Sequence, residues 1–318
     1  MKFKIAPVLM CLMLFSGCAS GGNNTNSDKL NIVCTNFPQY DWVKEITRGS
    51  DNVNITLLDD NGTDYHSYQP STDDIVNILS CDVFIYVGGE SDKWVEDTLK
   101  NSDNNENMRV VRLADMINGD LLDEPEVLES EHEHENESEE SFDEHVWLSV
   151  KNAVAFCNGI ADVISESDDS NADIYKKNAE EYISKLNSMD SEFEEKLLNS
   201  KRNSVLFADR FPFVYLMEDY DIDYDAAFPG CSSETDASFE TVVILAKEID
   251  DQELPYVITI ENSDCNIADA IISNTKYKNQ QILTLDSMQI VKNEDIENGK
   301  TYLSIMEKNL DVLMEALS

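Results

Sequence analysis

The chain has 318 residues, of which 64 are Asp or Glu and 23 are Lys or Arg, so its formal net charge is −41 at pH 7. This charge excludes a nucleic-acid partner, because binding to phosphates requires a basic surface that such a composition cannot supply. An acidic surface attracts cations and keeps a protein soluble, and the length suits two domains of ordinary size.

The first residues have the character of an export signal. A basic start is followed by an apolar run over residues 5–15, which is too short to cross a bilayer, and by Ser16 and Gly17. We predict a signal peptide over residues 1–17 and a flexible tether, rich in Gly, Asn and Ser, over residues 18–29. The segment that ends at Cys18 resembles a bacterial lipobox, in which the cysteine thiol carries the lipid. Phe15 stands where that motif usually has Leu.

The first half of the chain alternates between strand-like and helix-like segments. Short apolar runs predict strands at residues 30–35, 53–58, 81–87 and 110–113. Helical spacing marks residues 40–47, a turn follows over residues 59–70, and residues 71–74 open a helix with a capping pattern. This alternation predicts parallel strands joined by helices, in an N-terminal α/β domain over residues 30–165.

An acidic block interrupts this domain at residues 120–144. It contains 13 Asp or Glu residues and no Lys or Arg. Such a block has little apolar surface to bury, and we expect an acidic loop. Residues 147–165 are again helical in pattern.

A long amphipathic pattern without Pro or Gly predicts a helix over residues 172–198, about 40 Å long at 1.5 Å per residue. We interpret residues 170–200 as the link to a C-terminal α/β domain at residues 203–318. Its predicted strands and helices lie at residues 205–208, 239–249, 256–260, 281–285 and 302–317. The predicted fold class is therefore α/β, with two α/β domains of mainly parallel sheets joined by a long rigid helix.

Cysteine usage gives no sign of a disulfide framework. Five cysteines follow Cys18, an odd number, and no C-x-x-C pair occurs. Cys34, Cys81 and Cys157 lie in apolar runs, so we expect them to be small buried residues.

Two of the four histidines occupy positions typical of ligand binding. His66 lies in a turn between a predicted strand and a helix, and His145 directly precedes a helix. In α/β sheets, ligands collect at the loops beyond the carboxyl ends of the strands. The second half places acids at such ends, because Asp209, Glu261 and Asp286 each follow a predicted strand. Imidazoles facing carboxylates would form a mixed nitrogen and oxygen site that suits zinc or manganese.

Four motifs in this order resemble a known family. They are Thr35-Asn36-Phe37-Pro38-Gln39-Tyr40-Asp41-Trp42-Val43, the His66 turn that ends at Pro70, Asp82-Val83-Phe84-Ile85-Tyr86-Val87-Gly88-Gly89, and the His145 motif with the acidic insertion before it. From about residue 30 to the C-terminus, the chain resembles the zinc- and manganese-binding receptors of ABC importers, a TroA-like family that includes lipoprotein adhesins.

The resemblance implies a ligand set. His66 and His145 match the metal ligands of the N-terminal domain, and Asp286 matches the carboxylate from the C-terminal domain. Glu261 matches an acid that orients a ligand by hydrogen bonding. Family members have His or Glu where this chain has Ala208, and we take the adjacent Asp209 as the substitute.

The metal that the resemblance implies is zinc, with manganese as the alternative. Two histidines with carboxylates form a harder site than three histidines, which favours manganese, whereas the acidic loop with its histidines favours zinc. His132 and His134 in that loop are interpreted as a low-affinity metal collector, and the alternative is a solvated linker. Cys231 is a possible soft ligand, but we interpret it as part of a loop that leads to a helix.

The sequence thus predicts a monomeric receptor that is held to the outer face of the bacterial cell membrane by lipid on Cys18. It would deliver zinc to an ABC permease and its ATPase, with no enzymatic activity. Two alternatives are a manganese receptor of the same type and a surface adhesin with a structural metal. A hydrolytic zinc enzyme is a further alternative, but the chain has no H-E-x-x-H, no Gly-rich phosphate loop and no nucleophile elbow.

Overall fold

The structure is a computed structural model that describes residues 29–59, 61–100, 105, 107–125, 142–230 and 237–318. Several predicted features lie outside the described residues. They are the signal peptide, Cys18 with most of its tether, His132, His134 and Cys231. Among the described helices, none combines the length and the apolar character needed to span a membrane.

The first half is built on a parallel sheet of four strands in the order β2-β1-β3-β4. The strands are β1 (Leu30–Cys34), β2 (Val53–Leu57), β3 (Val83–Tyr86) and β4 (Arg109–Arg112). The helices of this half are α1 (Phe37–Ile46), α2 (Thr72–Ser80), α3 (Lys93–Leu99) and α4 (Val150–Ser167). Helix α2 begins with the predicted capping box, in which Ser71 and Asp74 bind each other's backbone N–H groups.

The second half repeats this architecture with a parallel sheet in the order β6-β5-β7-β8. Its strands are β5 (Ser204–Phe211), β6 (Asp223–Pro229), β7 (Tyr256–Ile260) and β8 (Gln281–Leu285). Its helices are α6 (Val214–Asp219), α7 (Phe239–Gln252), α8 (Asn266–Asn274), α9 (Asn293–Glu297) and α10 (Tyr302–Ala316).

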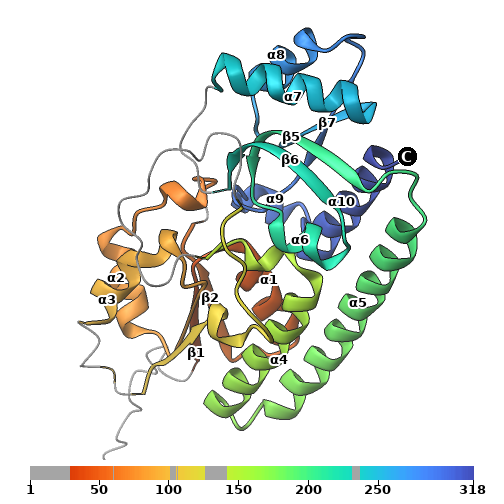
Figure 1. The fold of residues 1–318 in the computed structure, drawn as a ribbon. Coiled ribbons are helices and arrows are strands. Elements are labelled where there is room, and N and C mark those ends of the chain that lie inside the picture. The colour runs from red at the N-terminus through yellow and green to blue at the C-terminus, as the bar shows by residue number, and fades with distance from the viewer. Residues whose placement is uncertain (1–28, 60, 101–104, 106, 126–141, 231–236) are drawn as a thin grey trace, which may run out of the picture.

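The long helix α5 (Ala172–Leu198) joins the two halves. Figure 1 shows it along one side of the molecule, from α4 to the start of β5. It packs on α4 and α1 of the first half and on α10 of the second half. The predicted fold class is confirmed, whereas the predicted domain boundaries stay a prediction.

One hydrophobic core runs through both halves. Trp42 of α1 packs against Tyr302 of α10, with ring centroids 5.2 Å apart, and against Phe156 of α4 at 5.7 Å. The backbone N–H of Tyr302 also donates to the buried Asp41 carboxylate at 2.9 Å. Cys34, Cys81 and Cys157 are buried as predicted. These contacts fix the two halves against each other, so loops from both reach the same region.

Strand β5 differs from the prediction. It continues to Phe211 rather than ending at residue 208, so Asp209 lies within the strand. The pairing with β6 shifts register between Phe207 and Arg210, which indicates a bulge at this point. The prediction ended too early because a pair of charged residues interrupts the apolar run.

Candidate metal centre

His66 lies in a short 3-10 turn, Tyr65–Ser67, that follows the loop after β2. The carboxylate of Asp64 caps this turn, because its Oδ1 accepts from the backbone N–H of His66 at 3.0 Å. The other oxygen of Asp64 pairs with Nη2 of Arg210, from β5, at 2.6 Å. A contact between the two halves therefore holds the turn that carries His66.

His145 precedes another 3-10 turn, Val146–Leu148, and is fully buried. Asp143 Oδ1 accepts from the backbone N–H of His145 at 2.9 Å. The second half closes over this ring, because a Cβ on Gly230 would lie 2.7 Å from Cε1 of His145. Only glycine permits this close approach.

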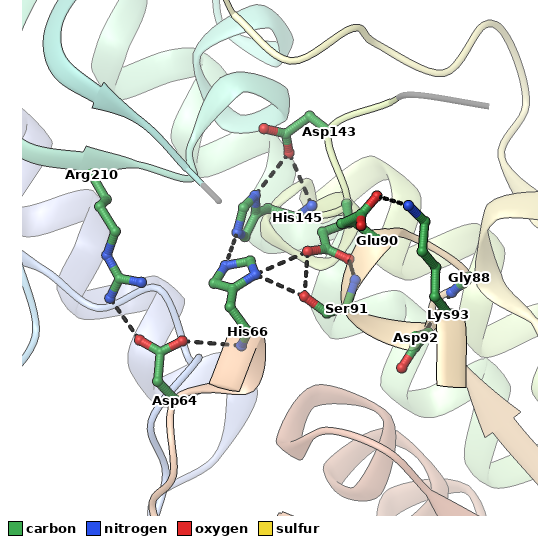
Figure 2. A network of polar contacts seen from close by, with 11 residues as sticks. Asp64, His66, Gly88, Glu90, Ser91, Asp92, Lys93, Asp143, His145 and Arg210 are labelled. Carbon is green, nitrogen blue, oxygen red and sulfur yellow. Dashed lines mark hydrogen bonds and ion pairs between the residues drawn. The ribbon is translucent and has the colours of Figure 1, made fainter. Parts of the chain in front are cut away.

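The two imidazoles point their Nε2 atoms at each other across 3.0 Å, with ring planes at 69° (Figure 2). Two ligands of a tetrahedral zinc ion, each at 2.0–2.1 Å, would be about 3.3 Å apart. The observed spacing is therefore close to what one shared metal ion requires. The structure brings His66 and His145 together, and their role as ligands stays a prediction.

A neighbouring acid binds the other nitrogen of each ring. Nδ1 of His145 lies 3.0 Å from Asp143 Oδ1, and Nδ1 of His66 lies 2.9 Å from Glu144 Oε1 and 2.8 Å from the Ser91 hydroxyl. An ionised carboxylate only accepts, so both Nδ1 atoms carry the proton and each neutral ring keeps its Nε2 lone pair free. Two lone pairs that face each other at this distance repel, unless a proton or a cation lies between them.

Electrostatics favour positive charge at this point. Burial alone would raise the pKa of Glu144, but hydrogen bonding to His66 and the charges of His66 and His145 lower it to about 2. Burial alone would lower the pKa of His145, and the Asp143 carboxylate reverses this, so that the net shift is upward. The Asp143 carboxylate therefore stabilises positive charge at His145.

Asp286 begins a loop, residues 286–289, that lies against both histidine-bearing turns. Nε1 of Trp147 donates to the Ser287 carbonyl at 2.9 Å, and the backbone N–H of Tyr65 donates to the Gln289 carbonyl at 3.2 Å. The Asp286 carboxylate itself is paired with Nζ of Lys300 at 2.9 Å.

Glu261, expected to support a ligand, holds this same loop. Its carboxylate accepts from the backbone N–H and the hydroxyl of Ser287, both at 2.7 Å, and from the backbone N–H of Gln289 at 3.2 Å. Burial, and then the charge of Asp286, raise the pKa of Glu261. Glu261 thus fixes the residues that follow Asp286 in this loop.

Among the described residues, the acids of the second half are not gathered at the histidines. Asp209 Oδ1 accepts from the N–H of its neighbour Arg210 at 2.9 Å, and the buried Ala208 packs among apolar residues. In the part of the chain that the structure describes, no three or more His, Cys, Asp or Glu side chains are placed to hold one metal ion. The ligand set of His66, His145, Asp209 and Asp286 stays a prediction.

Comparison with known proteins places the chain among zinc-uptake proteins. A model of the family described as zinc-uptake complex component A, periplasmic, matches residues 32–316. The chain belongs to this family. It is 29% identical over 316 residues to the zinc-binding lipoprotein AdcA of Streptococcus pneumoniae strain R6, which covers 99% of this chain and 60% of AdcA. It is 27% identical over 319 residues to the high-affinity zinc uptake system protein ZnuA of Bacillus subtilis strain 168. This match covers 98% of this chain and 96% of ZnuA.

Solved structures of zinc-binding and metal-dependent lipoproteins have the same fold as this chain. The zinc-bound ZnuA-like domain of S. pneumoniae AdcA superposes with a TM-score of 0.72 at 28% identity, covering 91% of this chain and 99% of that one. The metal-dependent lipoprotein YcdH of B. subtilis shares the fold, with a TM-score of 0.74 at 24% identity. The superposition covers 91% of this chain and 99% of YcdH. The chain spans about 60% of the length of full AdcA, so it matches one part of that protein.

Sequence reasoning missed four residues that shape the centre of this family member. Asp143 and Glu144 were assigned to the acidic loop, yet both are fully buried and bind the two histidines. Their position directly before His145 was the available signal. Asp64 and Arg210 form a pair between residues 146 positions apart, which no local pattern indicates.

Proposed function

We propose that this protein is an extracytoplasmic receptor that binds zinc between its two halves and delivers it to an ABC importer. The proposal rests mainly on the facing Nε2 atoms of His66 and His145, whose Nδ1 atoms are bound to acids. This arrangement presents two lone pairs at a spacing that suits one zinc ion. The family and the zinc-binding names of relatives support the same metal.

The partners follow from this role. A periplasmic component of an uptake complex requires a membrane permease and an ATPase that powers it, and we propose both as partners. We also propose that lipid on Cys18 holds the protein to the outer face of the membrane. The metal is cargo rather than a catalytic cofactor, and the protein has no enzymatic activity of its own.

Calorimetry on the whole chain without its leader tests the proposal. A double variant, His66→Ala with His145→Ala, should lose tight zinc binding. A matched double variant, His132→Ala with His134→Ala, should keep it, because those residues lie in the acidic block. Equal affinity in wild type and the first double variant would refute the proposal. Competition between zinc and manganese identifies the preferred metal, and zinc uptake in a deletion strain separates a receptor from an adhesin.

A further inference from the structure

Lys300 and Asp286 form an ion pair beside the candidate metal centre. Nζ of Lys300 lies 2.9 Å from Oδ2 of Asp286, and 24% of each side chain is exposed. The other carboxylate oxygen accepts from the backbone N–H of Met288 at 2.9 Å. A lysine therefore already occupies the acid that the family resemblance identifies as a metal ligand.

The backbone of each partner is held in place. Asn309 of α10 is buried and binds both the N–H and the carbonyl of Asp286, each at 2.9 Å. Lys300 lies in the turn between α9 and α10, where its N–H donates to the Asp295 carbonyl at 2.9 Å. The preceding Gly299 has a φ of +90°, which favours glycine and completes this turn. Rotation of either side chain therefore separates the pair without any change in these backbone contacts.

The 286–289 loop also contacts both turns that carry the histidines. Its next residue, Ser287, accepts a hydrogen bond from Trp147, whose ring centroid lies 5.3 Å from that of His145. Gln289 accepts from the backbone of Tyr65, which directly precedes His66. The Asp286 carboxylate is thus one residue from a contact with the His145 turn while it is bonded to Lys300.

We propose that Lys300 competes with zinc for Asp286 and thereby sets the zinc affinity of the receptor. This inference rests on the proposed function. Zinc that recruits Asp286 must first displace the Lys300 ammonium group, because one carboxylate oxygen cannot satisfy both cations at full strength. When zinc leaves, Lys300 pairs with the carboxylate again. Asp286 thus has a cationic partner in both the zinc-bound and the zinc-free receptor.

A Lys300→Met variant tests the competition, because it removes the ammonium group and keeps the length of the side chain. We expect it to bind zinc about 3- to 30-fold more tightly than wild type, because zinc no longer has to break a partly exposed ion pair. Lys308→Met is the matched control, because it removes one positive charge from an exposed site on α10. Lys300→Arg keeps the charge and should stay within about threefold of wild type. Thermal unfolding in zinc-free buffer verifies that each variant is folded.

The decisive comparison repeats Lys300→Met in an Asp286→Asn background, where competition for the carboxylate no longer exists. The gain in zinc affinity should then disappear. If the gain persists, or if Lys308→Met produces it as well, Lys300 acts only through general repulsion and the inference is wrong. Unchanged or weaker binding by Lys300→Met also overturns it. A wild-type chain whose zinc binding does not depend on His66 and His145 overturns the proposed function, and the inference with it.

Discussion

The Nε2 atoms of His66 and His145 face each other at 3.0 Å although the residues are 79 positions apart in the sequence. Each ring is oriented from behind by one of two consecutive acids, Asp143 and Glu144. The side chains that fix ring orientation are thus as close together in the sequence as two residues can be. A single loop therefore controls both proposed ligands.

Replacing Asp143 with Asn should weaken zinc binding about 10- to 100-fold, the range typical of groups that orient metal ligands. The Asn amide can donate to Nδ1, which would move the ring proton to Nε2 and block its lone pair. Competition with a chromophoric chelator measures the loss. Asp123→Asn, at an exposed acid of the same block, should leave the affinity unchanged. An equal affinity in both variants would show that Asp143 does not orient the ligand.

Breaking the pair between Arg210 and Asp64 should also weaken zinc binding. Burial alone would raise the pKa of Asp64, but hydrogen bonding to Arg210 and the Arg210 charge lower it, so the cap of the His66 turn depends on this contact. We expect Arg210→Gln to reduce the free energy of unfolding by about 1–2 kcal/mol, because the pair is partly exposed. Chemical denaturation and zinc titration of the same samples measure the two effects. Arg48→Gln, at an exposed ion pair, is the control.

Local patterns were sufficient for much of the fold. Helix α5 begins and ends at the predicted residues, because a long amphipathic stretch without Pro or Gly has few alternatives. Strands β7 and β8 also match their predicted bounds. Strand β6 was not predicted, since it lies at the edge of its sheet and carries Asp223 and Asp225, as exposed edge strands often do.

The site was less accessible to sequence reasoning. The histidines could be named, because each stands in a turn before a helix, but the burial of Glu144 depends on the close approach of Gly89 and Ser91, more than 50 positions away. The pairing of Asp286 with Lys300 depends in the same way on tertiary packing, because the turn before α10 brings the lysine to the loop after β8. Charge patterns along the chain do not carry this information.

Single substitutions test the two proposed acidic ligands, Asp286 and Asp209, one at a time. Asp286→Asn should weaken zinc binding at least tenfold, because a neutral amide is a poorer zinc ligand than a carboxylate. Asp209→Asn should weaken it as well if Asp209 replaces the family residue at Ala208. Calorimetry at fixed pH and salt compares the two variants. Full affinity in Asp209→Asn would remove that residue from the ligand set and leave the other three in place.

Deleting residues 129–140 tests the collector role of His132 and His134. Zinc acquisition should become slower when zinc is scarce, because fewer low-affinity ligands then concentrate the ion near the receptor. The affinity of the main site should not change. Uptake of radioactive zinc by cells and calorimetry on the purified protein provide the two measurements. A large loss of main-site affinity would contradict a collector and assign the segment to the binding site itself.

The buried carboxylate of Asp41 should make the protein more stable in mild acid. Burial raises its pKa from 3.8 to about 6, so the folded protein binds a proton more readily than the unfolded chain. This contribution is fully present below pH 3.8 and is lost as the pH rises through 6, with a maximum of about 3 kcal/mol. Asp41→Asn keeps an acceptor for the N–H of Tyr302 and cannot titrate.

Chemical denaturation at several pH values between 4 and 7 distinguishes Asp41 from the general relief of negative charge. Asp41→Asn should flatten the dependence of the unfolding free energy on pH over this interval, and it should be at least as stable as wild type at pH 7. The exposed Asp51 is the matched site, because Asp51→Asn removes the same charge without changing a buried group. Equal slopes in the two variants would mean that burial of Asp41 does not determine the response to acid, which would then come from other buried carboxylates, such as Asp92 and Asp219, or from repulsion across the surface.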